Sequence, residues 1–416
     1  MDVWKGVKER STNKRIRVLM AHTYLALPAK SRACDLLICD EVHRFTNEDT
    51  ELFGRVIDVT KNRWLLCLSA TLEDKHKKFL HSRGVKCIGQ VTMKEARECE
   101  YVAEHYTYFL ALPFTDEDRD KLDEINAEYH STWKPFGYSL DEVLGSMQGG
   151  PNGETLRAYY SELFNCNSDQ IFGLAKRAFN SMRERKCFLQ KAPSKVIIAN
   201  LVVKLFPGKK ILTFSEWTET ADQLTEVLGD SSRAIHSKLQ SQTRTITKTK
   251  VWKTTKGRAG FYNKNERKLT NLQIVDTLEG YACTWEVEKS VGPATLKKEN
   301  MALFQDSESG VNVLNTVRAL DEAADIEEVD VAIILSFTAK ARQTIQRIGR
   351  TIRWKKGKIA YIITLCMYDD RKNKKTQEQR WLERASSELD EFEWISIDQL
   401  KDIGNENNKR TDQITA

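Results

Sequence analysis

Apolar and polar residues alternate along two separate blocks of the chain, and this pattern predicts its secondary structure. In both blocks, short apolar runs rich in branched side chains are separated by amphipathic stretches. The first block predicts strands at residues 17–21, 36–39, 64–68 and 85–88. The second block predicts strands at residues 210–214, 311–315, 331–336 and 358–366. Strands that alternate with helices are typical of parallel sheets covered by helices, so the sequence predicts two α/β domains.

Three further segments lie outside these strands. Residues 112–192 are polar and contain the loop Gly-Gly-Pro-Asn-Gly at 149–153, which predicts a mostly helical connecting segment. Residues 245–296 resemble neither neighbour in composition and predict an insertion on a loop. We therefore expect an α/β domain over residues 1–100, a connecting segment over 101–194, and a second α/β domain over 195–385 that contains the insertion. A C-terminal tail over 386–416 is expected to fray from about Asn405.

Composition and charge describe a soluble globular protein. Among 416 residues, 65 Lys or Arg accompany 59 Asp or Glu, and the net charge of +6 does not by itself favour a nucleic-acid partner. No apolar run approaches the roughly 18 residues of a membrane helix, and the first residues lack the apolar core of a secretory signal. The nine cysteines include no Cys-x-x-Cys pair, which favours buried thiols in a reducing compartment. We expect an intracellular protein, in the cytoplasm or nucleoid, or in the nucleus if the source is eukaryotic.

Two adjacent carboxylates, Asp40 and Glu41, follow the strand predicted at residues 36–39. Open α/β folds bind ligands at the carboxyl ends of their strands. In a nucleotide-hydrolysing site, the first carboxylate can hold Mg²⁺ through its water shell and the second can deprotonate the attacking water. The alternative is an ordinary helix N-terminal turn. Ser69 and Thr71 follow the next strand and favour a site, because their hydroxyls can hydrogen-bond the acidic turn.

Arginines recur every three residues at Arg347, Arg350 and Arg353. On a helix this spacing places them on one face, from which all three can reach one anionic site. Arginine suits phosphate because its planar fork bonds two oxygens, and an arginine finger stabilises the charge on a transferring phosphoryl group. The alternative is a solvated basic helix face, but Gly349 and the preceding apolar strand favour a site.

These segments resemble the motifs of a known family. Asp-Glu-Val-His at residues 40–43, Ser-Ala-Thr at 69–71 and residues 346–353 are similar to motifs II, III and VI of the superfamily 2 helicases and translocases, in that order. Residues 210–215 resemble motif IV, and residues 315–326 resemble motif V of the DNA repair and transcription-factor branch, with Ala323 where that branch usually has glycine. The resemblance covers residues 17–368 and implies two RecA-like domains, the first incomplete at its amino end.

The resemblance implies a role for each matching residue. It makes Asp40 the Mg²⁺ carboxylate, Glu41 the general base, and Arg350 and Arg353 the fingers that reach ATP across the interdomain cleft. Residues that bind the nucleotide or couple its state to domain closure would be His43, Ser69, Thr71, Asp325, Gln346 and Arg347. Residues that contact nucleic acid would include Thr23 and Thr316. The implied cofactors are ATP and Mg²⁺, and the implied partner is nucleic acid, DNA more than RNA.

The phosphate-binding loop of these helicases, Gly-x-x-x-x-Gly-Lys-Ser/Thr, does not occur in the sequence. The two Gly-Lys pairs, Gly208-Lys209 and Gly357-Lys358, lack a following hydroxyl residue. We therefore expect a chain truncated at its amino end, with weak or absent ATP turnover on its own. It would be a fragment of a longer helicase, half of a split enzyme completed by a partner chain that supplies the loop, or a degenerate relative that only binds nucleic acid. The retained downstream residues favour the first two.

The insertion is locally basic. Between residues 244 and 268, nine basic residues accompany one acid, and three aromatic residues are interleaved among them. Basic groups neutralise phosphates and aromatic rings can stack on bases. The predicted nucleic-acid contacts are therefore Lys250, Trp252, Lys253 and Arg258. The alternative is a solvated basic hairpin with its aromatic rings packed beneath it.

Together these features predict an ATP-dependent helicase or translocase that moves along a nucleic-acid strand. The first alternative is a non-catalytic nucleic-acid-binding or accessory subunit. The second is a metal-dependent nuclease built on Asp40 and Glu41, which is disfavoured because no further carboxylates cluster with them at motif spacing.

Overall fold

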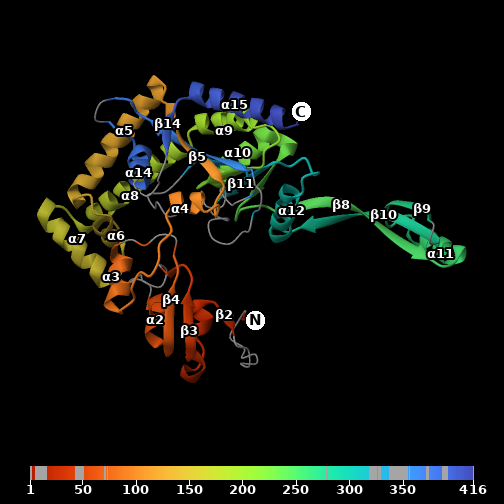
Figure 1. Ribbon diagram of the computed structural model, residues 1–416, viewed down its shortest axis with the longest axis horizontal. Coiled ribbons are helices and arrows are strands. Elements are labelled where there is room, and N and C mark those ends of the chain that lie inside the picture. The colour runs from red at the N-terminus through yellow and green to blue at the C-terminus, as the bar shows by residue number, and fades with distance from the viewer. Residues whose placement is uncertain are drawn as a thin grey trace. The chain divides into compact units, whose positions relative to one another are not determined.

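The computed structural model describes residues 2–4, 16–42, 51–69, 72, 74–277, 280–317, 326, 329–336, 355, 357–371, 374–386 and 392–415. The chain divides into two compact units, Met1–Ala96 and Arg97–Ala416 (Figure 1). Within the described ranges, no helix has the length and apolar character needed to cross a membrane.

The first unit contains two pairs of parallel strands. β1 (Asp2–Trp4) pairs with β2 (Arg17–Leu19), and β3 (Cys34–Cys39) pairs with β4 (Asn62–Cys67). The helical elements in this part of the chain are α1 (Ala21–Leu25), the 3-10 helix η1 (Ala29–Arg32), α2 (Glu51–Val59), α3 (Asp74–Ser82) and α4 (Met93–Glu98). Two small core clusters stabilise the unit, one containing Tyr24, Leu27 and Val56 and the other Cys39, Val42, Ile57 and Leu80.

The strands predicted at residues 36–39 and 64–68 are confirmed as β3 and β4. The strand predicted at residues 17–21 ends at Leu19, and a helix begins at Ala21. Tyr24 and Leu27 lie three residues apart, a spacing typical of a helix, and both pack against Val56.

The strand predicted near residues 85–88 does not form. Instead, the Val85 amide donates to the Leu80 carbonyl at 3.1 Å, and the Gly84 amide donates to the His81 carbonyl at 2.9 Å. Gly84 has a φ of +71°, so this bonding pattern is the glycine cap that ends many helices. Val85 therefore caps α3 and packs on its core cluster, and does not start a strand.

The second unit is built on a seven-stranded sheet in which all neighbouring strands are parallel. The strand order is β14-β5-β13-β12-β6-β11-β7. The strands are β5 (Glu104–Pro113), β6 (Ile211–Ser215), β7 (Ser232–Ile235), β11 (Val313–Val317), β12 (Val331–Ile334), β13 (Ile359–Tyr368) and β14 (Glu393–Ile395). Strands β6, β11 and β12 are buried along their whole length. The predicted α/β fold is confirmed, and the four strands predicted here match β6, β11, β12 and β13.

Helices pack on this sheet and complete the core of the second unit. They are α9 (Pro193–Leu205), α10 (Thr218–Leu228), the 3-10 helix η4 (Gly229–Ser231), α12 (Pro293–Gln305), α14 (Gln377–Ser386) and α15 (Ile397–Thr415). β5 and β14 join the sheet from outside the range expected for the second domain. β5 pairs in register with β13 from Glu104 to Pro113, and β14 pairs with β5. Leu400 in α15 is fully buried, so the segment expected to be a tail contributes to the core.

The segment between β5 and α9 is helical, as its polar pattern predicts. Its helices are α5 (Asp116–Trp133), the 3-10 helix η3 (Lys134–Phe136), α6 (Leu140–Met147), α7 (Gly150–Phe164) and α8 (Ser168–Gln190). Side chains of Thr115, Ser139 and Asn167 accept hydrogen bonds from backbone amides in the first turns of α5, α6 and α8, which fixes where these helices begin. A separate core around Trp133, Phe136 and Ile171 holds them together.

The predicted insertion forms an antiparallel sheet with one helix, which we call the arm (residues 242–291; Figure 1). β8 (Gln242–Trp252) pairs with β10 (Gly280–Val291), and β10 pairs with β9 (Thr270–Thr277). α11 (Thr255–Asn265) follows β8 and packs on the three strands. The arm is thus a small sheet of its own, separate from the seven-stranded sheet.

Candidate functional site

The acidic turn lies beside the end of a neighbouring strand. Residues 40–42 follow β3, and Leu68 and Ser69 follow β4. The Val42 amide donates to the Leu68 carbonyl at 2.9 Å, and the Leu68 amide donates to the Cys39 carbonyl at 2.9 Å. These bonds hold the carboxyl ends of the two parallel strands together. The acidic turn and Ser69 therefore lie at one edge of the β3–β4 sheet.

Glu41 has an unusual backbone conformation. Its φ of 51° lies in the left-handed region that few non-glycine residues adopt. Its amide donates to Oδ1 of Asp40 at 2.9 Å, and the buried side chains of Cys39 and Val42 hold the turn on either side. Such a conformation costs on the order of 1–3 kcal/mol and is found preferentially at functional sites. This favours a functional turn over an ordinary helix N-terminus.

The two carboxylates fit a magnesium ion that is shared with phosphate. Asp40 is exposed and Glu41 is half-buried. In phosphoryl-transfer sites Mg²⁺ keeps several waters and takes one or two carboxylates together with substrate phosphates. Among the described residues there is no group of three or more His, Cys, Asp or Glu side chains that could hold a metal ion. The exposed carboxylate of Asp40 is accessible to an ion of this kind.

Several predicted site residues lie outside the described part of the chain. They are His43, Thr71, Asp325, Gln346, Arg347, Arg350 and Arg353, together with Ala323 of the motif V segment. Their roles stay predictions from the motif resemblance.

The two threonines expected to contact nucleic acid are buried. Thr23 is 2% exposed and lies in α1, and Thr316 is 1% exposed and lies in β11. The Thr316 hydroxyl donates to the Thr213 carbonyl at 2.6 Å, which joins β11 to β6. Both side chains pack inside their own unit in this structure, and their contact with nucleic acid stays a prediction.

Aromatic rings on the arm pack against one another. The ring centroids of Trp252 and Phe261 are 4.7 Å apart, and those of Phe261 and Trp285 are 5.4 Å apart. The Lys250 ammonium lies 5.5 Å from the centroids of both Trp252 and Phe261. This arrangement matches the alternative in which basic side chains cover packed rings.

The other two predicted contacts on the arm differ in their surroundings. Lys253 is exposed just before α11. The Arg258 guanidinium lies over the Tyr281 ring, 5.1 Å from its centroid, and is half-buried. Lys253 is therefore freer to meet a partner than Arg258.

A buried ion pair escaped the sequence analysis. Lys195 in α9 and Glu378 in α14 are fully buried, and Nζ of Lys195 lies 2.6 Å from Oε1 of Glu378. Lys195 also donates to the Leu335 carbonyl after β12, and Glu378 accepts from the Met367 amide in β13. Burial raises the pKa of the Glu378 carboxyl, while the nearby Lys195 charge lowers it. The pair ties two helices to the carboxyl ends of β12 and β13, and its only sequence signal is one lysine inside an apolar helix.

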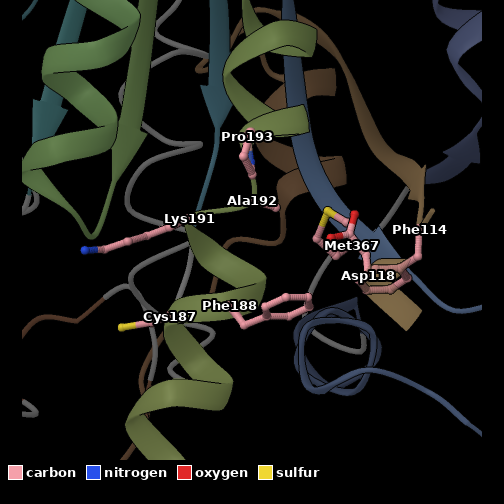
Figure 2. Close-up of a pocket in the computed structure, with 8 residues that line it drawn as sticks. All are labelled: Phe114, Asp118, Cys187, Phe188, Lys191, Ala192, Pro193 and Met367. Carbon is pink, nitrogen blue, oxygen red and sulfur yellow. The ribbon is translucent and has the colours of Figure 1, made fainter. Parts of the chain in front are cut away.

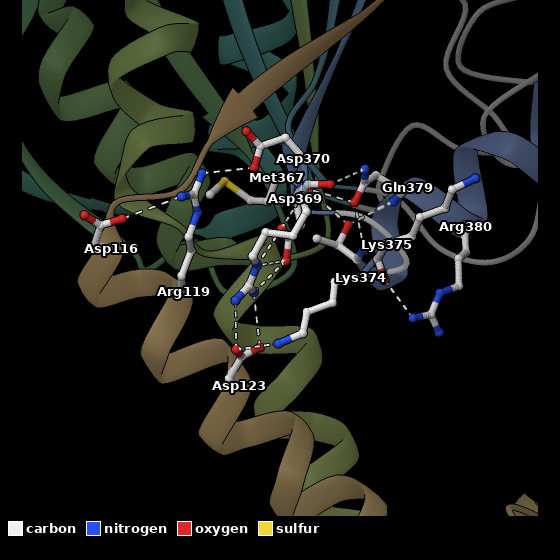
Figure 3. A network of polar contacts seen from close by, with 12 residues as sticks. Asp116, Arg119, Asp123, Met367, Asp369, Asp370, Lys374, Lys375, Gln379 and Arg380 are labelled. Carbon is white, nitrogen blue, oxygen red and sulfur yellow. Dashed lines mark hydrogen bonds and ion pairs between the residues drawn. The ribbon is translucent and has the colours of Figure 1, made fainter.

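A polar network fixes α5 to the end of β13 (Figure 3). Arg371 donates to Asp369 and to both carboxylate oxygens of Asp123, at 2.8 Å and 3.1 Å for the latter. Lys374 also donates to Asp123, at 2.9 Å. Hydrogen bonds from Arg371 lower the pKa of Asp369 and Asp123, and the two carboxylates raise the pKa of Arg371. These charges pair internally, so the network anchors the helical segment to the sheet.

A mainly apolar pocket lies near the same strand end (Figure 2). The pocket is lined by the segment between β5 and α5, by α5, by the junction of α8 and α9, and by β13. The lining residues are Phe114, Asp118, Cys187, Phe188, Lys191, Ala192, Pro193 and Met367. None of the predicted site residues lines it. All of its lining residues belong to the second unit.

Comparison with known families supports the motif assignment. Residues 262–355 match the family described as the helicase conserved C-terminal domain. The matched range begins in α11, contains β11 and β12, and extends through the predicted motif VI.

The fold is similar to several solved structures. S. cerevisiae Dbp5 bound to RNA and ADP BeF3 is 14% identical with a TM-score of 0.43, over 96% of this chain and 72% of that one. The Pyrococcus furiosus Hef helicase domain is 16% identical with a TM-score of 0.42, over 91% and 82%. The ATP-dependent type ISP restriction-modification enzyme LlaBIII bound to DNA is 13% identical with a TM-score of 0.46, over 92% and 23%. A comparison with curated proteins finds no match. Residues 262–355 are therefore similar to a helicase C-terminal domain, in agreement with the motif resemblance over this part of the chain.

Proposed function

We propose that this chain is the motor portion of an ATP-dependent helicase or translocase that acts on DNA. The observation that carries the proposal is the position of the acidic turn and Ser69 at the same edge of the β3–β4 sheet, where backbone bonds join Val42 and Cys39 to Leu68. The helicase C-terminal domain match supports the second domain that such a motor requires. The preference for DNA rests on the resemblance of residues 315–326 to the repair and transcription-factor branch.

Asp40 and Glu41 have different tasks in this proposal. Asp40 would hold Mg²⁺, which when bound neutralises charge on the transferring phosphates. Glu41 would orient the attacking water and take its proton. Arg350 and Arg353 would stabilise the charge that develops on the phosphoryl group. The residues proposed to bind the nucleotide or couple its state to domain movement are His43, Ser69, Thr71, Asp325, Gln346 and Arg347.

Hydrolysis also needs donors for the triphosphate. The 416 residues contain no Gly-x-x-x-x-Gly-Lys-Ser/Thr loop, whose backbone amides and lysine would supply those donors. We place the loop in another segment or in a partner chain. ATP turnover by these residues alone should therefore be weak or absent.

The test is ATP hydrolysis with single-stranded DNA, duplex DNA and RNA, measured for the chain alone and together with a polypeptide that carries the loop. We expect DNA-stimulated turnover only in the combined sample, and Glu41→Gln should abolish it because the water loses its base. Turnover by the chain alone would contradict the need for an added loop. Turnover that survives Glu41→Gln would contradict the proposed base.

A non-catalytic nucleic-acid-binding subunit is the second candidate, and the missing phosphate loop together with the basic arm favours it. In that case DNA binding would not respond to ATP in any mixture, and hydrolysis would never appear. A nuclease would instead cleave DNA with Mg²⁺ and without ATP, and this outcome would replace both proposals.

A further inference from the structure

The arm carries much of the chain's net charge. Between residues 242 and 291, ten basic side chains accompany five acidic ones, which leaves +5 of the chain's +6. Neighbouring residues of β8 point to opposite faces of the sheet. One face carries Arg244, Lys248, Lys250 and Trp252, and the other carries threonines at residues 243, 245, 247 and 249.

The acidic side chains of β10 lie on the threonine face. Glu286 pairs with Thr247 and Glu288 with Thr245, and residues that pair directly share a face. The face that carries the lysines therefore has the stronger positive potential. An anionic partner should approach from that face.

α11 covers this basic face. Phe261 in the helix packs between Trp252 and Trp285, and Trp285 pairs directly with Lys248. Because these aromatic rings pack against one another, they offer little surface for stacking on bases. Contacts with nucleic acid through the arm should therefore go mainly to phosphates.

The outer side of α11 carries small side chains in its middle and charged side chains at both ends. Arg258, Phe261, Tyr262 and Asn265 are half-buried towards the sheet, and Lys256, Ala259, Gly260, Asn263 and Lys264 are exposed. Lys253 precedes the first turn, and Arg267 and Lys268 follow the last. At 1.5 Å per residue, the helix is about 16 Å long.

Gly260 contacts no other part of the described chain through the position where a side chain would lie. A Cβ added there would meet nothing within 4 Å, whereas a Cβ on Gly257 would lie 3.0 Å from Cδ1 of Trp252. Glycine in the middle of a helix lowers its stability relative to alanine. Packing against Trp252 accounts for Gly257, whereas at Gly260 the outer face of the helix carries no side chain.

We propose that α11 docks across the major groove of duplex DNA, with the basic residues at its two ends on phosphates of opposite strands and Gly260 at the closest approach. The major groove of B-DNA is about 12 Å wide and admits an α-helix, so a helix of about 16 Å reaches both of its edges. The major groove of duplex RNA is too deep and narrow for this contact. This proposal adds to the proposed function that the bound DNA is a duplex. It rests on the proposed function only for the choice of DNA as the partner.

The test measures how tightly a short fluorescein-labelled DNA duplex binds to the whole chain. Fluorescence anisotropy reports the binding over a range of salt concentrations, and no nucleotide is added. The double variant Lys256→Gln/Lys264→Gln should weaken binding about tenfold or more and lower the slope of log affinity against log salt by about two. Gly260→Leu should weaken binding about tenfold because its side chain blocks the approach, although the change favours the helix. Duplex RNA of the same sequence should bind more weakly than DNA.

Lys176→Gln in α8 removes an exposed charge outside the arm and is the matched control, which should bind like the wild type. Circular dichroism and thermal unfolding establish that each variant is folded. The proposal is overturned if the folded arm variants bind duplex DNA as the wild type does, or if duplex RNA binds equally well. The binding assay contains no nucleotide. If the chain combined with a loop-carrying polypeptide showed no ATP hydrolysis, the proposed function would be refuted, but this binding result would stand.

Discussion

Two parallel sheets in this molecule have similar sequences and different surroundings. β3 reads Cys-Asp-Leu-Leu-Ile-Cys and β12 reads Val-Ala-Ile-Ile, and both are largely apolar. In β12 every residue is fully buried. In the β3–β4 pair, Leu36 is 49% exposed, Ile38 is 53% exposed and Trp64 is 64% exposed.

The strands and helices around each sheet account for this difference in exposure. β12 has a strand on each side, whereas β3 and β4 form a two-stranded sheet. Parallel sheets are normally covered on both faces. A continuous apolar run therefore predicts that a strand forms, but the rest of the fold determines how much of that strand is buried.

The largest effect should come from the buried ion pair of the second unit. Lys195→Met leaves the Glu378 carboxylate buried without its cation, and removal of one partner of a buried pair costs about 3–5 kcal/mol. Urea unfolding monitored by hydrogen exchange should show this loss in peptides of the seven-stranded sheet. Peptides of the first unit should be unaffected.

The double variant Lys195→Met/Glu378→Leu is the control for this prediction. With both charges replaced by apolar side chains, most of the lost stability should return. A single variant as stable as the wild type would mean that the pair does not hold the ends of β12 and β13 together.

A second pair of substitutions tests the two sheets directly. Ile333→Ala in β12 removes fully buried atoms and should cost about 2–5 kcal/mol. Ile38→Ala in β3 removes atoms that are half exposed and should cost less than about 1 kcal/mol. Unit-specific unfolding free energies from hydrogen exchange measure both. If both substitutions cost the same unfolding free energy, the exposed face of β3 must be covered in solution. The two sheets would then not differ in burial.

Local patterns predicted the central strands of the second unit and the acidic edge of the first. The runs at residues 210–214 and 331–336 became β6 and β12, and the acidic turn and Ser69 lie at adjacent strand ends. Each of these features depends on a short stretch of chain and on the general geometry of parallel sheets.

Features that depend on distant residues were missed. β5 joins the sheet through pairing with β13, more than 240 residues further along the chain. Lys195 and Glu378 are separated by 183 residues, and nothing in either local sequence indicates the other. Both outcomes depend on tertiary contacts that periodicity does not describe. Val85 was missed for a local reason, because the glycine cap of α3 determines its structure although its neighbours are strand-like.

The response to acid should also differ between the units. Hydrogen bonds from Arg371 lower the pKa of Asp369 and Asp123, whose ordinary value is 3.8. A carboxyl group with a lower pKa in the folded state contributes stability that is complete above its unfolded-state pKa. That stability is lost as the pH falls through the folded-state value. The second unit should therefore keep this contribution down to about pH 4 and lose it below.

Arg371→Met should cost roughly 1–2 kcal/mol at neutral pH, and the difference from the wild type should shrink below about pH 4. Arg83→Met in the first unit is the comparison. Arg83 also lowers the pKa of Asp58, but the Asp58 side chain is 49% exposed and Arg83→Met should cost less than about 1 kcal/mol. Urea unfolding at several pH values measures both. A difference for Arg371→Met that does not change with pH would rule out the carboxylates as its cause.

The smallest effects should be equal in the two units. Gly84 in the first unit and Gly208 in the second both have a φ of +71°, and an added Cβ would meet nothing within 4 Å at either position. Substitution by alanine therefore changes backbone strain without changing packing, and each variant should lose about 1 kcal/mol. Hydrogen exchange in the adjoining helices, α3 and α9, measures the two losses. If the stability losses of Gly84→Ala and Gly208→Ala differ as widely as those of Ile38→Ala and Ile333→Ala, then the backbone contributes to the different stability of the two units. Equal losses would mean that the difference comes from how far the strands of each sheet are buried.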